Sequence, residues 1–91
     1  MKRDYQKLLQ SANTAMLEKL KKNDHKSGFD NIDFIYALDR TFKEWLELRD
    51  AMMKGLYKKE IISEVRAEAA DVANFAAMII YRCDNELNRK K

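Results

Sequence analysis

Apolar residues recur every three or four positions along most of this chain, which is the spacing of one face of an α-helix. Three segments show the pattern, at about residues 4–22, 32–54 and 57–87. Between the first two, residues 23–31 are rich in turn formers and form the only real loop that we expect. The pattern predicts an all-α fold, a small bundle of three main helices in a single domain that spans residues 1–91.

Local signals place the ends of the second helix. Asp30 or Asn31 is suited to cap its N-terminus, because a side-chain oxygen there accepts a hydrogen bond from a free backbone N–H. Gly55 fits a position just past its C-terminus, where a left-handed backbone is common. These residues predict an abrupt turn from the second helix into the third.

The third helix changes character along its length. From Val72 to Ile80 it is apolar on every side apart from Asn74, and such a stretch is typical of a helix buried on every side. We expect Asn74 to need hydrogen-bonding partners there, and Cys83, further along, to be a small buried hydrophobe.

Two pairs of acids are the most informative chemical feature. Glu44 and Glu47 lie three apart in the second helix, and Glu68 and Asp71 lie three apart in the third. Residues at this spacing share a helix face, so antiparallel packing can bring all four carboxylates together. Because the acids repel one another in a dry interior, a divalent cation is the simplest remedy. Oxygen-only ligands favour Mg²⁺, with Mn²⁺ also suitable.

The acidic stripe extends toward the start of the third helix. Glu60 and Glu64 lie on the same face as Glu68 and Asp71, and the stripe continues into the apolar stretch. Either residue is a candidate outer ligand, although Glu60 is better explained by stabilisation of the helix N-terminus. The competing interpretation of the whole stripe is a solvated face with no ion.

Composition narrows the function classes. The 91 residues carry a net charge of +3, one cysteine and no apolar run of membrane-spanning length, so we expect a cytoplasmic protein without a disulfide. Basic residues do not alternate with aromatic ones as on a nucleic-acid surface, which makes nucleic acid an unlikely partner. A hydrophobic content of 46% is ordinary to high, although a chain this short buries limited apolar area. We therefore expect a homodimer or homotetramer that uses apolar surface of the first and third helices.

The acids resemble a motif of the all-α nucleoside triphosphate pyrophosphohydrolases, the MazG-like superfamily that includes the dimeric dUTPases. The family pattern, Glu-x-x-Glu followed after a spacer by Glu-x-x-Asp, is met by Glu44, Glu47, Glu68 and Asp71. The string Glu-Ala-Ala-Asp-Val-Ala-Asn-Phe at residues 68–75 is similar to phage-type and mobile-element members.

Residues 23–29 add to the resemblance. They read Asn-Asp-His-Lys-Ser-Gly-Phe and are similar to the Asn-x-His-Lys-Gly-Gly-Trp of those members. The chain departs from the family at Lys43, where an acid is usual, and Asp84-Asn85 come later than the family's Asp-Asn element. The likeness spans about residues 23–80, and the departures leave open a relative that has lost activity.

The resemblance implies Mg²⁺-dependent hydrolysis of a nucleoside triphosphate between the α- and β-phosphates, which yields a monophosphate and pyrophosphate. The four acids are then the metal ligands, and Glu44 or Glu47 activates the water. Substrate-binding candidates are Lys26 for a phosphate, His25 for the nucleotide, and Asn74, for which a role in helix packing is equally compatible. Trp45, between the two acids of the second helix, is better explained as a core or interface residue.

Three other interpretations compete. A non-catalytic helical oligomerisation or interaction module predicts indifference to Mg²⁺ and nucleotides. A nucleic-acid-associated protein predicts salt-dependent binding. A di-iron bundle requires Glu-x-x-His pairs, and the only histidine, His25, lies far from both acidic pairs.

Overall fold

The computed structural model describes residues 4–22 and 32–89 as three α-helices without a strand among them. They are α1 (Tyr5–Lys22), α2 (Phe34–Met52) and α3 (Lys59–Arg89). The prediction of an all-α fold of three packed helices is confirmed, with helix ends that differ from expectation by one or two residues. Residues 23–31, the expected loop with His25 and Lys26, lie outside the described residues.

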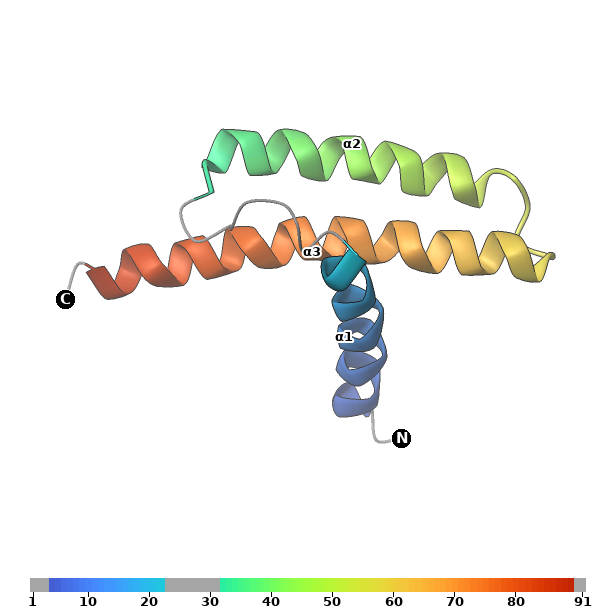
Figure 1. The fold of residues 1–91 in the computed structure, drawn as a ribbon, viewed down its shortest axis with the longest axis horizontal. Coiled ribbons are helices and arrows are strands. Elements are labelled where there is room, and N and C mark those ends of the chain that lie inside the picture. Colours follow the sequence, from blue (N-terminus) through green and yellow to red (C-terminus); the bar gives the residue numbers. More distant parts are fainter. Residues whose placement is uncertain (1–3, 23–31, 90–91) are drawn as a thin grey trace.

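The longest helix, α3, is the central element (Figure 1). Helix α2 runs antiparallel along one side of it, and α1 runs across it on the other side, so that both packing contacts of the fold involve α3. Within the described ranges, no helix has the length and apolarity that a membrane crossing requires.

The start of α2 is set by Asp33 rather than by Asp30 or Asn31. The Asp33 side chain accepts a hydrogen bond of 3.0 Å from the backbone N–H of Tyr36, which satisfies one free donor of the first turn. At the other end the chain leaves the helix through Gly55, whose φ of +103° is accessible to glycine at little cost. The expected role of Gly55 is therefore confirmed.

The packed interior of the single chain holds small side chains. Among the described residues, the buried apolar ones are the alanines Ala15, Ala37, Ala51 and Ala70, and no large side chain is fully buried. The stretch from Val72 to Ile80 is half-buried rather than enclosed, with Ile80 63% exposed, and Cys83 is exposed. The prediction that this stretch and Cys83 are buried is thus wrong for the chain alone, because α1 and α2 cover only part of the circumference of α3.

Polar contacts attach α1 to the middle of α3. The buried Asn74 side chain donates a hydrogen bond of 3.1 Å from Nδ2 to the backbone carbonyl of Met16. Lys19 forms an ion pair with Asp71 at 3.3 Å, and Glu18 forms one with Arg66 at 2.8 Å. These contacts hold the C-terminal half of α1 beside the acidic stripe of α3.

Candidate metal centre

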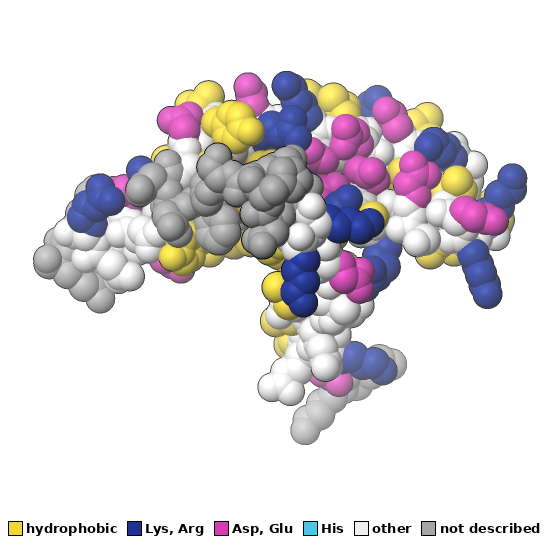
Figure 2. All heavy atoms as spheres, in the orientation of Figure 1, with side chains coloured by type: hydrophobic (Ala, Val, Ile, Leu, Met, Phe, Trp, Pro, Cys, Tyr) yellow, Lys and Arg dark blue, Asp and Glu magenta, His cyan; other side chains and the backbone are white. Residues whose placement is uncertain are grey.

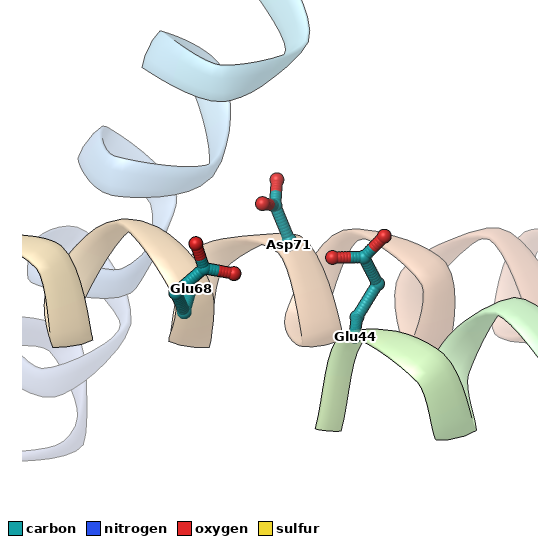
Figure 3. Close-up of side chains that lie close together, drawn as sticks. All are labelled: Glu44, Glu68 and Asp71. Atoms are coloured by element: carbon teal, nitrogen blue, oxygen red, sulfur yellow. The ribbon is translucent and has the colours of Figure 1, made fainter. Parts of the chain in front are cut away.

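Three of the four predicted acids converge at the contact between α2 and α3. Glu44 comes from α2, and Glu68 and Asp71 come from successive turns of α3, with carboxylates presented to the same side of the helix pair (Figure 3). One oxygen from each carboxylate lies within 4.8 Å of the others. The spacing of three residues on α3 and the antiparallel approach of α2 together produce this arrangement.

Glu47, the fourth acid, lies beside this group of three. Its side chain is exposed and is not among the three whose oxygens converge. It nevertheless acts on the group, because its charge and its hydrogen bonding raise the pKa of both Glu44 and Glu68. The structure therefore brings all four acids into one neighbourhood, with Glu47 at the exposed edge.

Burial and mutual repulsion make this neighbourhood unfavourable for negative charge. Glu44 is only 6% exposed, and its pKa is raised from 4.5 to about 7 by burial first, then by Glu47 and Asp71. Arg40 opposes this shift through an ion pair of 2.8 Å with Glu44. The pKa of Glu68 is also raised, first by burial and then by the charges of Glu47 and Asp71.

A buried oxygen without a partner points to what the group can hold. Among the described residues, Glu68 Oε2 is buried and has no hydrogen-bond partner, which is costly for a carboxylate. Oxygen ligands of octahedral Mg²⁺ at 2.0–2.1 Å lie roughly 3–4 Å apart. A small contraction of the 4.8 Å group reaches that spacing. The donor set thus fits a hard divalent cation, with Glu44, Glu68 and Asp71 as ligands and Glu47 as a candidate fourth.

Cations lie next to the acids on the same face of the molecule. Acidic side chains gather along the contact of α2 with α3 in Figure 2, with Lys and Arg side chains close by. Beside them a pocket of about 500 Å³ is lined by one acid, Glu18, and by four cations, which are Lys19, Lys21, Lys22 and Arg66. Negative and positive groups therefore adjoin, in part as ion pairs such as Lys19 with Asp71, and a metal-bridged polyanion requires both kinds of group.

Sequence reasoning missed Lys19 and Arg40 as members of the site. Lys19 lies among the cations of the last turn of α1 and forms an ion pair with Asp71. Arg40 precedes Glu44 by four residues, and this helical spacing is the signal that could have identified it. The contact of Lys19 depends on where α1 crosses α3, which no local spacing encodes.

The remaining candidates take different positions. Asn74 has a helix-packing role through Met16, while its Oδ1 is buried with no partner among the described residues. Glu64 is held by Lys54 at 2.8 Å rather than joining the cluster. Trp45 is 46% exposed and stacks on Phe42, so it is not a core residue of the single chain.

The raised pKa of Glu44 predicts that the free energy of unfolding of the metal-free protein falls as the pH rises. An acid whose pKa is higher in the folded chain binds its proton more tightly when folded, so its contribution is fully present below pH 4.5 and is lost as the pH rises through about 7. We expect the free energy of unfolding in EDTA to fall by on the order of 2 kcal/mol between pH 5 and pH 8. Urea denaturation across this range measures it, and a rising or flat profile would contradict the assigned environment of Glu44.

No family model matches the chain, and the searches of curated proteins and of solved structures found no match either.

Proposed function

We propose that this protein is a Mg²⁺-dependent nucleoside triphosphate pyrophosphohydrolase that takes part in housekeeping of the nucleotide pool. The observation that carries the proposal is the convergence of Glu44 from α2 with Glu68 and Asp71 from α3. These residues belong to the two motif halves on which the resemblance to the MazG-like superfamily rests. Residues 47 and 68 are separated by the turn between helices, so their proximity is not a consequence of local spacing alone.

Burial distinguishes this cluster from ordinary surface acids. Glu44 is among the most buried residues of the described chain, and Glu68 Oε2 has no partner there. Bound Mg²⁺ would neutralise the carboxylates and supply electrophilic stabilisation to the phosphate oxygens. The cost of burying these acids is then offset when the cation is present.

The neighbouring cations supply what a phosphate chain needs. Lys19 lies within 3.3 Å of Asp71, and the pocket that continues from it presents Lys21, Lys22 and Arg66. A triphosphate whose reacting phosphorus lies over the acids can extend its outer phosphates toward these side chains. Lys26, the residue that the resemblance favours for phosphate, lies outside the described residues and keeps that role as a proposal.

Glu47 is the best placed of the two candidate bases. Because it is exposed and lies outside the group of three converging carboxylates, we assign it to orient a water and accept its proton. The water oxygen bonds to the α-phosphorus, and the bond from that phosphorus to the bridging oxygen breaks. Pyrophosphate leaves, and the proton resides on Glu47. Glu44 is then assigned to metal binding, with Arg40 holding its carboxylate in place.

A second candidate function is a non-catalytic helical interaction module. The exposed apolar side chains of α1, α2 and α3 favour it, since such surfaces mark sites of association. Association and catalysis are compatible, so the two candidates differ only in whether the acids turn over nucleotides. The module predicts no effect of nucleotide or Mg²⁺ on the protein.

A pyrophosphate-release assay discriminates between them. The protein is incubated with the common ribonucleoside triphosphates, the common deoxyribonucleoside triphosphates, dUTP and several modified nucleotides. Each incubation is made in Mg²⁺, in Mn²⁺ and in EDTA. We expect release of pyrophosphate and a monophosphate with at least one substrate in Mg²⁺, and none in EDTA. Absence of release from every nucleotide, in folded protein, would favour the interaction module.

A further inference from the structure

The ion pair of Lys19 with Asp71 joins α1 to an acid of the proposed cation site. Lys19 Nζ lies 3.3 Å from Asp71 Oδ2, and the two side chains are 25% and 18% exposed. A second ion pair between α1 and α3, that of Glu18 with Arg66, is more open, with side chains 58% and 47% exposed. Solvent and salt screen a sheltered pair less than an open one. The charge of Lys19 therefore acts on Asp71 with less screening than in an ordinary surface pair.

A divalent cation and the Lys19 ammonium compete for the same carboxylate. Asp71 is one of the three acids whose oxygens converge, and the ammonium lies 3.3 Å from it. A Mg²⁺ ion binds a carboxylate oxygen at roughly 2.0–2.1 Å. A cation bound to Asp71 is then within one Debye length of the ammonium, which is about 8 Å at physiological ionic strength. The two positive charges repel, so binding of the cation favours departure of Lys19 from Asp71.

Arg40, which also contacts the acids, is held more firmly than Lys19. Its guanidinium pairs with Glu44 at 2.8 Å and lies over the Phe75 ring, 5.5 Å from the ring centroid. Pairing within one helix and contact with an aromatic face both restrict the Arg40 side chain. Lys19 instead reaches Asp71 from another helix, through a flexible four-carbon stem. Lys19 is therefore the cation that can leave its acid at lower cost.

The space into which the Lys19 side chain can turn adjoins its present position. Lys19 lines the pocket of about 500 Å³ between the C-terminal half of α1 and α3. The backbone of α1 is held close by, because Asn74 Nδ2 donates a hydrogen bond of 3.1 Å to the carbonyl of Met16, one turn before Lys19. Rotation of the Lys19 side chain is thus sufficient for the exchange, and α1 remains in place.

Departure of Lys19 changes the charge of both places. Asp71 loses its partner and presents its full negative charge to the cation. The pocket gains an ammonium that no longer pairs with an acid, beside Lys21 and Lys22. Because the strength of a charge-assisted contact to phosphate depends on an available positive charge, the pocket then binds a phosphate chain more tightly.

We propose that Lys19 is an exchangeable counter-ion, which neutralises Asp71 until a divalent cation binds and then turns into the pocket to contact the outer phosphates of the substrate. The inference rests on the proposed function, because it takes the acids as the cation site and a phosphate chain as the ligand of the pocket. Lys19 then weakens binding of the cation alone and strengthens binding of a phosphate chain once the cation is present. The competing interpretation is a purely structural tie between α1 and α3. That tie predicts no gain in cation affinity when Lys19 is replaced.

The test compares the parent with Lys19→Met in the full chain, since methionine retains an apolar stem without the charge. Mn²⁺ binding is measured by electron paramagnetic resonance of the free ion, and binding of inorganic pyrophosphate at saturating Mg²⁺ is measured by calorimetry. We expect Lys19→Met to bind Mn²⁺ at least about fivefold more tightly and pyrophosphate at least about fivefold more weakly. Mn²⁺ binding that is unchanged or weaker, or pyrophosphate binding that is unchanged or tighter, would overturn the proposal.

Two matched variants serve as controls for Mn²⁺ binding. Lys7→Met removes the same charge from an exposed position near the start of α1, and Glu18→Gln breaks the second ion pair between α1 and α3. We expect both variants to bind Mn²⁺ within about twofold of the parent, as for surface changes away from the site. A gain in either variant as large as that in Lys19→Met would attribute the effect to net charge or to loosening of α1, and would overturn the proposal.

Nuclear magnetic resonance of lysine ammonium groups covers the case in which Lys19→Met does not fold. The Nζ signal of Lys19 in the parent, assigned by its loss in Lys19→Arg, should shift when Mg²⁺ is added because the ammonium leaves Asp71. A signal that is unchanged at saturating Mg²⁺ would overturn the proposal.

These measurements separate the role of Lys19 from the proposed function, because none of them requires nucleotide turnover. A parent that shows the exchange but hydrolyses no nucleotide would remove the proposed function and retain the exchange. Nucleotide turnover by the parent, together with unchanged Mn²⁺ binding in Lys19→Met, would retain the proposed function and remove the exchange.

Discussion

Asp71→Asn is expected to reduce Mg²⁺-dependent pyrophosphate release by at least about 100-fold, while helical content stays at the parental level. The amide keeps the size of the side chain but loses the charge that binds the cation. The measurement is the initial rate at saturating Mg²⁺, accompanied by far-ultraviolet circular dichroism. Asp71 also pairs with Lys19, so a modest loss of stability is expected alongside the loss of rate.

Asp84→Asn is the matched control for this prediction. Asp84 is an exposed acid on the same helix, α3, and is not part of the converging group. Its variant should retain the parental rate within about twofold, as expected for a surface change away from the site. A parental rate in Asp71→Asn would remove Asp71 from the metal site, and equal losses in both variants would indicate a general effect of charge.

Glu44→Gln is expected to act in opposite directions on the metal-free and the metal-bound protein. In EDTA at pH 8 the variant should be more stable than the parent by on the order of 2 kcal/mol, because an acid with a pKa of about 7 is ionised there against its environment. In Mg²⁺ the parent should gain stability through ligand binding, and the variant should gain little. Urea denaturation in EDTA and in 10 mM Mg²⁺ measures both effects.

Glu18→Gln provides the contrast. Glu18 is exposed and its pKa is lowered by its hydrogen bond and ion pair with Arg66, so its charge is favourable rather than costly. Its variant should not be more stable than the parent at pH 8, and it should respond to Mg²⁺ as the parent does. If Glu44→Gln instead destabilises the metal-free protein, the ion pair of Glu44 with Arg40 outweighs the repulsion between Glu44 and the neighbouring acids. The cluster is then a structural charge network rather than a cation site.

The secondary structure of this protein, and the helix face on which each acid lies, follow from periodicity within single segments. The spacing of apolar residues determined the three helices to within two residues at each end, and Gly55 marked the turn that follows the end of α2 at Met52. The spacing of three residues placed each pair of acids on one helix face. These features depend on angles about a single helix axis, and neighbouring positions in the chain specify those angles directly.

Tertiary structure decided which of these faces meet. It placed Glu44, Glu68 and Asp71 together with Glu47 at the edge, and it brought Lys19 against Asp71. It also left the apolar stretch of α3 half-exposed, although the stretch reads as buried. The register between α2 and α3 and the point where α1 crosses α3 are set by packing between residues distant in the chain. The local sequence pattern does not specify how residues that are distant in the chain pack together, so only the tertiary structure could determine these contacts.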